Sequence, residues 1–326
     1  MKALLDKMVN GYMLTKDEAK SVLMKITAGD FNNSQIISFL TIYIMRTPSV
    51  EEFLGFREAL LDLSLQLDFS DINSIDIVGT GGDGKDTFNI STLSCFVVAG
   101  AGYKVTKHGN YASSSVSGSS NVLENLGYKF SNDESVLKKQ VEEANITFLH
   151  APLFHPALKN MAPLRKDLGL RTIFNLLGPV VNPVKPSNQL LGVYSKEIGD
   201  LYSGLLKSAN MNYSIVHSKD GYDEISLTSD FDLFTNKGHE IVKPSDLGFK
   251  KIEQKDLYGG DTPEKAAKIF IDILEGKGTE AQNNAIIANS AYAISTISTK
   301  PILDCIDIAK ESLNSGNALN SLKKIV

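Results

Sequence analysis

The hydrophobic pattern from Met1 to Asp68 is that of helices. "LTKDEAKSVLMKI" and "SVEEFLGFREALLDLSLQL" each begin near a hydroxyl residue, Thr15 or Ser49, with a glutamate, Glu18 or Glu52, three positions later. This is the capping-box pattern, in which the two side chains satisfy backbone N–H groups at the start of a helix. Between them, "SQIISFLTIYIMR" is apolar on nearly all sides and predicts a buried helix. We therefore predict a small helical domain over residues 1–68.

From Ile75 onward, short apolar runs alternate with helical segments. The runs are "IDIVG", "YKVTKHG", "ITFLH", "LLGVY" and "YSIVH". This alternation predicts a mostly parallel central sheet flanked by helices. A segment rich in Pro and Asn, "RTIFNLLGPVVNPVKPSNQ", interrupts it and is expected to cross between lobes. The predicted fold class is α/β with a separate small all-α domain. The α/β domain covers 69–326, and part of 160–188 completes the helical domain.

Composition and charge narrow the classes of function. The 326 residues are 42% hydrophobic and 22% charged, with a net charge of −5, so the basic excess of a general nucleic-acid binder is missing. The first residues, with charges at Lys2, Asp6 and Lys7, show neither a signal peptide nor a membrane span. Cys95 and Cys305 form no C-x-x-C pair, which argues against a zinc or redox site. We expect a cytoplasmic protein without membrane or nucleic-acid partners.

The loop "VGTGGDGKDTFNIST" resembles two nucleotide-binding patterns without satisfying either. Gly79, Gly81 and Gly84 fit G-x-G-x-x-G, but the acidic residue that a dinucleotide site needs about 20 positions later is absent, and Lys104 stands in that region. The P-loop pattern needs Ser or Thr after its lysine, and Asp86 stands there instead. Four glycines within six residues, followed by hydroxyls where a helix should begin, still predict an anion-binding loop.

A second donor-rich segment follows the first. From Thr87 to Leu123 there is no Asp or Glu, and 11 residues are Ser or Thr. At its centre, "KHGNYASSSVSGSSNVLENLG" places Lys107 and His108 at the end of a predicted strand and a serine-rich loop before another helix. Two such loops suit a ligand with two separate phosphate groups. A lone histidine is more often structural than catalytic, and the residues around His108 allow either role.

Two further motifs carry candidate chemistry. Adjacent Asp223 and Glu224 in "GYDEIS" could both face Mg²⁺ if they lie in a loop, whereas a strand would turn them to opposite faces; the alternative is a solvated acidic pair. Arg165 in "PLRKDLGLRTIF" could bind a carboxylate through both guanidinium nitrogens. Its alternative is a surface arginine like its neighbour Lys166, and Arg171 is a rival for the same role.

Taken in order, "GTGGDGKDTFNIST", "KHGN", "SGSSNVLENLG", "HPALKNMAPLRKDLGLRTIFNLLGPVVNP" and "GYDEIS" resemble the anthranilate phosphoribosyltransferase family. The resemblance covers nearly the whole chain. It implies a nucleoside phosphorylase class II-like fold and transfer of the phosphoribosyl group of phosphoribosyl pyrophosphate to anthranilate, with release of pyrophosphate, in tryptophan biosynthesis. It also implies Mg²⁺ dependence and a homodimer.

The resemblance assigns roles to particular positions. Those that would bind phosphoribosyl pyrophosphate are Gly79, Gly82, Asp83, Thr87, Asn89, Ser91, Thr92, Lys107, His108, Gly109, Asn110, Ser114, Ser115 and Ser119. The metal ligands would be Ser91, Asp223 and Glu224. The residues in contact with anthranilate would be Gly79, Asn110 and Arg165. The residues with a catalytic role would be Lys107, His108 and Arg165. Three positions depart from the family pattern: Tyr111 stands where a basic residue is common, Val116 where Lys or Arg is frequent, and Asn121 where Asp is usual.

The implied chemistry needs no base before attack, because an aromatic amine is unprotonated at neutral pH. We therefore predict catalysis by positioning and electrostatics, without a covalent intermediate. The proton lost after attack could go to water or to His108. Two rival interpretations are a pyrimidine nucleoside phosphorylase, which shares the architecture, and a non-catalytic relative that binds nucleic acid.

Overall fold

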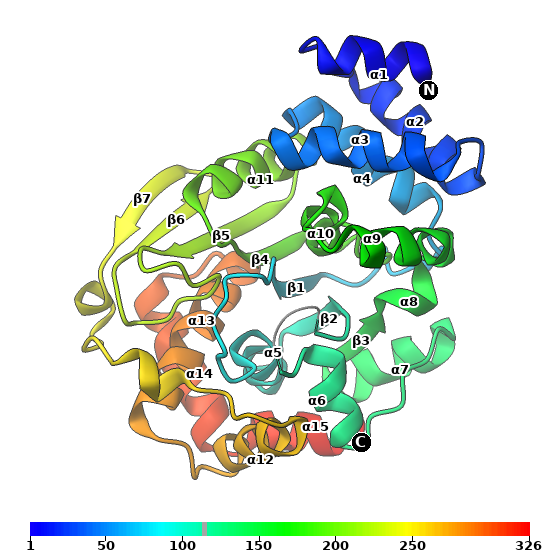
Figure 1. Ribbon diagram of the computed structural model, residues 1–326. Coiled ribbons are helices and arrows are strands. Elements are labelled where there is room, and N and C mark those ends of the chain that lie inside the picture. Colours follow the sequence, from blue (N-terminus) through cyan, green and yellow to red (C-terminus); the bar gives the residue numbers. More distant parts are fainter. Residues whose placement is uncertain (113–115) are drawn as a thin grey trace. The chain divides into compact units, whose positions relative to one another are not determined.

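The chain folds into two compact units in a computed structural model that describes residues 1–112 and 116–326 (Figure 1). The predicted fold class is confirmed, with an α/β part built on a mostly parallel sheet and a small all-α part. The helical unit comprises Met1–Leu67 and Ala151–Pro183, and the α/β unit comprises Asp68–His150 and Val184–Val326. The second passage of the chain through the helical unit thus spans 151–183, where part of 160–188 was expected.

The helical unit begins with the capping boxes that the sequence predicted. The Thr15 side chain accepts a hydrogen bond from the Glu18 backbone N–H, and Glu18 reaches back to Thr15; Ser49 and Glu52 repeat the arrangement. The elements of this unit are α1 (Lys2–Val9), α2 (Lys16–Ala28), α3 (Asn33–Met45), α4 (Val50–Asp62), α8 (Ala151–Phe154), the 3₁₀ helix η1 (Pro156–Met161), α9 (Ala162–Leu168), α10 (Ile173–Leu177) and η2 (Gly178–Val180).

Helix α3 is less buried than its apolar sequence predicted. Phe39 and Leu40 are buried, but Ser38 and Thr41 are exposed and Met45 is 83% exposed. The expectation of a buried helix therefore holds for one face only: the hydroxyl residues share the opposite face, which is turned to solvent.

The two segments of the helical unit are joined by hydrogen bonds to backbone carbonyls. Arg57 Nε donates to the Val180 carbonyl oxygen (2.9 Å), and the Leu65 backbone N–H donates to the Phe154 carbonyl oxygen (2.8 Å). Within the second segment, His155 Nε2 lies 2.9 Å from the Val181 carbonyl oxygen. The first of these bonds links residues far apart in sequence. The segment Met1–Leu67 therefore completes its fold only with Ala151–Pro183.

The α/β unit is built on a seven-stranded sheet in the order β3-β2-β1-β4-β5-β6-β7. The strands are β1 (Ser74–Gly79), β2 (Lys104–Gly109), β3 (Ile146–His150), β4 (Asn188–Gly192), β5 (Asn212–Ser218), β6 (Phe231–Thr235) and β7 (Gly238–Val242). The first five in spatial order pair in parallel, and they correspond to the five predicted runs. The last two are an antiparallel hairpin that the sequence analysis missed.

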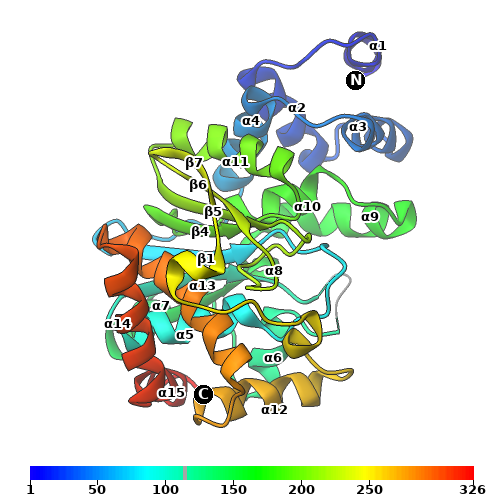
Figure 2. The same cartoon turned by 90° about the vertical axis from the view of Figure 1, so that its left-hand side faces the viewer.

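Helices cover both faces of this sheet (Figures 1 and 2). The helices of this unit are α5 (Ile90–Gly100), α6 (Ser119–Asn125), α7 (Glu134–Ala144), α11 (Lys196–Ser208), η3 (Pro244–Leu247), η4 (Gln254–Leu257), α12 (Pro263–Leu274), α13 (Glu280–Ser298), α14 (Ile302–Asn314) and α15 (Asn317–Lys323). In β6, Phe231 packs on Tyr292 of α13, whereas a Cβ added at Gly199 of α11 would meet the Phe234 ring. Residues three apart in a strand face opposite sides, so α13 and α11 cover opposite faces.

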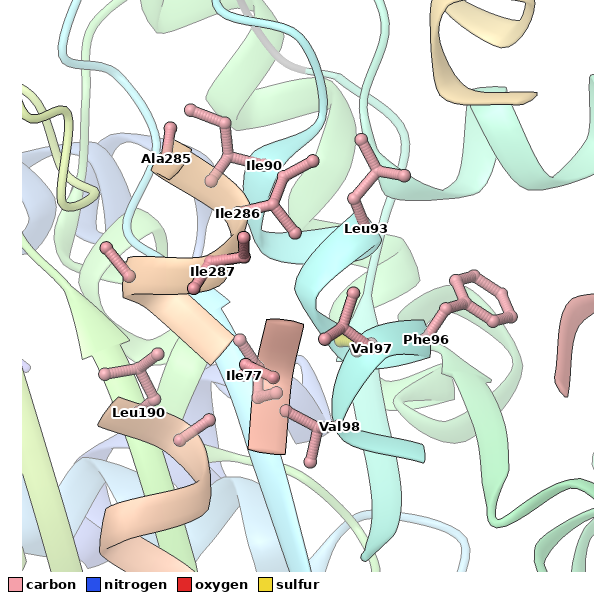
Figure 3. Close-up of a cluster of buried hydrophobic side chains, with 14 of the residues drawn as sticks. Ile77, Ile90, Leu93, Phe96, Val97, Val98, Leu190, Ala285, Ile286 and Ile287 are labelled. Atoms are coloured by element: carbon pink, nitrogen blue, oxygen red, sulfur yellow. The ribbon is translucent and has the colours of Figure 1, made fainter. Parts of the chain in front are cut away.

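The main hydrophobic core lies between the sheet and the pair α5 and α13 (Figure 3). Ile77 and Leu190 of the sheet, Ile90 of α5, and Ile286 and Ile287 of α13 belong to this cluster and are nearly inaccessible to solvent. Strands buried on both faces read as continuous apolar runs, which is why the parallel strands were easy to recognise. Among the described residues, no helix is long and apolar enough to span a bilayer.

The strand order reverses its direction of growth at β1. From β1 the chain adds β2 and then β3 on one side, and returns to place β4 on the other. In open α/β sheets, ligands bind beyond the carboxyl ends of the strands at such a switch point. The carboxyl ends of β1 and β4 are Gly79 and Gly192, which are direct register partners.

Candidate active site

The loop after β1 is built on glycines with left-handed backbone conformation. Gly81, Gly82 and Gly84 have φ angles of 65°, 75° and 73°. Residues with a Cβ rarely adopt this region, so the loop requires glycine here. The loop ends at Asn89, the N-cap of α5, which places Ser91 in the first helical turn. The structure therefore has the predicted glycine-rich turn leading into a helix N-terminus.

The first turn of α5 binds a carboxylate of the chain itself. Glu224 accepts hydrogen bonds from the Ser91 backbone N–H (2.9 Å), from the Ser91 hydroxyl (2.8 Å) and from the Thr87 hydroxyl (3.3 Å). Free N–H groups at a helix start favour negative charge. The start of α5 thus binds an anionic group, the Glu224 carboxylate, and phosphate binding at this loop stays a prediction. Thr92, in the same turn, is buried.

Asp223 lies at the carboxyl ends of the two switch-point strands. Its Oδ2 accepts a hydrogen bond from the Gly81 backbone N–H (2.6 Å). Gly79 and Gly192 make room for it: a Cβ added at Gly79 would overlap the Asp223 carboxylate, and one added at Gly192 would overlap the Asp223 carbonyl group. Asp83, the third carboxylate of the region, faces the Asp223 backbone N–H at 3.5 Å.

The adjacent carboxylates are buried and perturb each other. Asp223 and Glu224 are each 8% exposed. Burial raises the pKa of Asp223 well above its usual range, and the charges of Glu224 and Asp83 raise it further. Burial raises the pKa of Glu224 to about 7, against the hydrogen bonds from Ser91 that lower it. A bound cation would favour the ionised form of both groups.

The donor set fits Mg²⁺ completed by ligands from outside the chain. Asp223 and Glu224 lie in a loop, so strand alternation does not separate them. In the part of the chain that the structure describes, no group of three or more His, Cys, Asp or Glu side chains could hold a metal ion. Mg²⁺ commonly uses one or two carboxylates together with waters and substrate phosphates. These two carboxylates with the Ser91 hydroxyl match that pattern.

A neutral amide, that of Asn121, holds the two sides of the second predicted loop together. Asn121, in the first turn of α6, accepts hydrogen bonds from the backbone N–H groups of Ala112 (2.9 Å) and Gly118 (3.0 Å). Asn89 donates to the Ser117 carbonyl oxygen (2.9 Å) and so ties the N-cap of α5 to this loop. The two loops are therefore adjacent. The Asn121 amide oxygen thus accepts two bonds at this loop without adding a negative charge.

The start of α6 packs closely on the end of β2. The Asn110 carbonyl oxygen accepts a hydrogen bond from the Ser119 hydroxyl (3.3 Å), and a Cβ added at Gly109 would overlap that hydroxyl. Three candidate positions, Gly109, Asn110 and Ser119, thus lie together. Ser114 and Ser115 lie outside the described residues.

Tyr111 joins an aromatic cluster at the side of the second loop. Its hydroxyl donates to Glu124 (2.6 Å), and its ring meets the His150 ring edge-on, with centroids 4.7 Å apart. Phe130 stacks on the same imidazole, and His150 Nδ1 lies 2.9 Å from the Ser120 hydroxyl. A residue type that departs from the family pattern therefore has a local function here, because it holds the loop to α6 and β3.

Lys107 and His108 are inside the sheet. Both side chains are buried, the Lys107 ammonium donates to the Ile77 carbonyl oxygen, and the His108 backbone N–H donates to the Asp76 carboxylate (3.2 Å). Lys107 thus brings a positive charge to the strand that ends at Gly79. Asp76, a buried acid next to these residues, was missed from the sequence because it lies within an apolar run.

Arg165 belongs to the helical unit, on α9. Its Nη2 lies 3.4 Å from the Asn175 side-chain oxygen, and its guanidinium is 5.6 Å from the centroid of the Phe174 ring. Burial lowers the pKa of this guanidinium. Lys166 and Arg171 are exposed, whereas Arg165 is only partly exposed, so of the three Arg165 is least like an ordinary surface residue.

Two contacts of the site had no signal in the sequence. Gly192 lies under Asp223, although it looked like an ordinary residue of the run "LLGVY". Lys85, the lysine of the glycine loop, lies over the Tyr222 ring with its ammonium 4.6 Å from the centroid. Both contacts join segments that are distant in the sequence, a separation that local patterns do not encode.

Comparison with known proteins defines the class. Two family descriptions match: "Glycosyl transferase family, helical bundle domain" over residues 2–64, and "Glycosyl transferase family, a/b domain" over residues 71–319. The chain therefore belongs to a glycosyltransferase class with a helical part and an α/β part.

Closely similar relatives identify one family within this class. The chain is 54% identical over 325 residues to an anthranilate phosphoribosyltransferase of Flavobacterium psychrophilum, covering 100% of this chain and 98% of the relative. It is 54% identical to that of Cytophaga hutchinsonii, with 100% of both chains covered. The crystal structure of the Thermus thermophilus enzyme matches with a TM-score of 0.93 at 31% identity, covering 98% of this chain and 97% of the other. The chain belongs to the anthranilate phosphoribosyltransferase family, and the predicted family, enzyme class and reaction are confirmed.

Proposed function

We propose that the site at the ends of β1 and β4 carries out the reaction of this family. The phosphoribosyl group of phosphoribosyl pyrophosphate is transferred to the amine of anthranilate, and pyrophosphate is released. The observation that supports this most is the buried pair Asp223 and Glu224, placed between a glycine loop and the start of α5 at the switch point of the sheet. The pair would hold Mg²⁺ together with the Ser91 hydroxyl.

The two loops would bind the sugar phosphates. The glycines of the first loop have no side chains, so phosphate oxygens could approach its backbone closely. The second loop contributes hydroxyls from a segment without carboxylates, and the bond from Asn89 to Ser117 holds the loops side by side. When bound, Mg²⁺ would neutralise charge on the departing pyrophosphate. Lys107 adds a fixed positive charge below the loop, which requires no reorganisation during the reaction.

Arg165 is proposed to bind the anthranilate carboxylate. Its guanidinium rests against Phe174 and is partly shielded from water, which strengthens an ion pair with a carboxylate. His108 remains a candidate acceptor for the proton released after attack, with water as the alternative.

Solved relatives support these assignments. A Saccharomyces cerevisiae anthranilate phosphoribosyltransferase described as in complex with PRPP and Mg matches with a TM-score of 0.87 at 30% identity, covering 96% of this chain and 93% of the other. A Gly141Asn variant of the yeast enzyme is described as in complex with 4-fluoroanthranilate. We transfer the ligands to this chain as proposals.

We further propose a cytoplasmic homodimer in which a second copy covers apolar side chains of the helical unit. Val9, Met13 and Met45 are 68%, 48% and 83% exposed, on or beside helices of one small unit. Such exposed apolar residues commonly mark an interface. Sedimentation equilibrium should give twice the 35.5 kDa chain mass.

The reaction is tested by mixing the protein with anthranilate, phosphoribosyl pyrophosphate and Mg²⁺ and following the loss of anthranilate fluorescence. The double variant Asp223→Asn with Glu224→Gln should abolish the response to Mg²⁺. Asp261→Asn, which removes an exposed carboxylate paired with Lys265, is the matched control and should leave it unchanged. A full Mg²⁺ response in the double variant would remove these residues from the metal site.

Two further measurements separate the substrates. Arg165→Ala should raise the anthranilate KM strongly and leave binding of phosphoribosyl pyrophosphate unchanged, whereas Lys166→Ala should alter neither. Phosphorolysis of thymidine or uridine with free phosphate in place of the transfer reaction would favour the nucleoside phosphorylase alternative.

A further inference from the structure

Asn289 is a buried polar residue on the mostly apolar middle of α13. It is 2% exposed, and its neighbours Ala288 and Ala291 are fully buried. Its Oδ1 accepts a hydrogen bond from the Ile225 backbone N–H (3.1 Å). Its Nδ2 donates to the Ile225 carbonyl oxygen (2.9 Å) and to the Ala285 carbonyl oxygen (2.9 Å). Both N–H donors of the Asn289 amide are therefore used, and Asn289 is hydrogen-bonded to both the N–H and the carbonyl oxygen of Ile225.

Ile225 directly follows the carboxylate pair. The segment that carries Asp223 and Glu224 lies between β5 and β6 and has no strand ladder to fix it. It is held from within by the Ser218 hydroxyl, which donates to the Glu224 carbonyl oxygen (2.6 Å). Leu227, a little further along, has a φ of 61° and is fully buried. A left-handed conformation is unfavourable for a branched side chain, so surrounding contacts must impose it.

Helices α5 and α13 therefore hold the same short segment from two sides. The Glu224 carboxylate is bound by Ser91 at the start of α5, and the next residue is bound by Asn289 on α13. The two helices pack in one core cluster, in which Ile90 of α5 lies near Ile286 of α13 (Figure 3). Because the two helices are packed against each other in the core, they fix the position of the segment that carries Asp223 and Glu224.

We propose that Asn289 is a positioning residue for metal binding: through Ile225 it sets the place of Asp223 and Glu224. This inference rests on the proposed metal role of the pair. Asn289 itself is too deep in the fold to be a ligand. Residues that orient metal ligands typically change metal affinity or activity by about 10- to 100-fold when replaced.

A merely structural role makes a different prediction. A buried asparagine that only satisfies backbone groups would, when replaced, lower stability and leave the metal response of the folded protein intact. A positioning role changes metal affinity in protein that is still folded. Metal affinity and stability must therefore be measured on the same variants.

The test counts bound Mn²⁺, used as a spectroscopic substitute for Mg²⁺, by electron paramagnetic resonance in the presence of phosphoribosyl pyrophosphate. Asn289→Ala should weaken Mn²⁺ binding by about 10-fold or more and change the anthranilate KM by less than about 2-fold. Thr296→Val is the matched control, because it removes a buried hydroxyl on α13 that bonds Tyr292 and Ser214 instead of the carboxylate segment. It should lower the melting temperature and leave Mn²⁺ affinity unchanged.

Asn289→Asp is the second variant should the alanine variant not fold. It has nearly the same shape, retains an acceptor for the Ile225 N–H and loses both amide donors, so Mn²⁺ affinity should again fall. Mn²⁺ affinity within about 2-fold of wild type in a folded variant overturns the inference. If wild-type protein binds no Mn²⁺ with phosphoribosyl pyrophosphate present, the proposed metal site fails instead, which is a distinguishable outcome.

Discussion

Replacing Gly192 by alanine should damage the active site more than the fold. The added Cβ would overlap the Asp223 carbonyl oxygen and lie 2.6 Å from its carbonyl carbon, inside the 3.0 Å that Cβ contacts respect. A backbone group cannot swing aside as the end of a side chain can. Because the carbonyl oxygen would lie only 1.5 Å from the added Cβ, the Asp223 backbone must withdraw by roughly 1.5 Å and take the carboxylate with it. A displacement of about 1 Å in a positioned group can cost about 100-fold in rate.

The stability cost of the same change is that of an overpacked core, about 1–3 kcal/mol. Initial rates at saturating Mg²⁺, together with a thermal melt, measure both quantities. Gly199→Ala is the control, because its Cβ would press on the Phe234 ring at 2.7 Å, away from the site. It should lose comparable stability and keep its rate. Equal loss of rate in both variants, or wild-type kinetics for Gly192→Ala, would refute the idea that Gly192 makes room for Asp223.

Two further predictions concern other parts of the molecule. Burial lowers the pKa of His155 to about 4 although the Val181 carbonyl opposes this, so between about pH 6.5 and pH 4 the unfolded chain gains a proton at this residue before the folded chain does. Its contribution to the free energy of unfolding should be complete above about pH 6.5 and fall by about 3 kcal/mol towards pH 4. In urea titrations, the free energy of unfolding of His155→Gln should fall less steeply over this pH range than that of the wild type. An identical pH slope in the two proteins would contradict the assignment. Tyr111→Phe removes the hydroxyl bond to Glu124 and should raise the KM for phosphoribosyl pyrophosphate about 3-fold with almost no change in melting temperature; an unchanged KM would show that this bond does not hold the second loop.

Features encoded within a few residues were predicted correctly from the sequence. The capping boxes at Thr15 and Ser49 need only a residue pair three positions apart. The parallel strands were readable because both faces are buried and the runs are continuously apolar. The glycine loop was recognisable because Gly81 and Gly82 adopt a backbone conformation that few other residues tolerate.

Features that depend on distant partners were missed or wrongly predicted. The hairpin β6–β7 has no extended apolar run, and its outer strand is mostly exposed. The face of α3 that carries Ser38 and Thr41 was expected to be buried, because an apolar sequence alone does not show which face has a neighbour. Gly192 and Asn289 act on Asp223 and Ile225 across long separations, so their roles emerged only once the chain was folded.

The discontinuity of the helical unit has a consequence for synthesis on the ribosome. The segment Met1–Leu67 emerges early, but the partner of Arg57 lies within Ala151–Pro183, beyond the first half of the sheet. At ordinary translation rates the early helices wait on the order of 10 s for the missing segment. During that interval their apolar faces lack a cover, so nascent chains stalled before Pro183 are the ones that should depend most on chaperones.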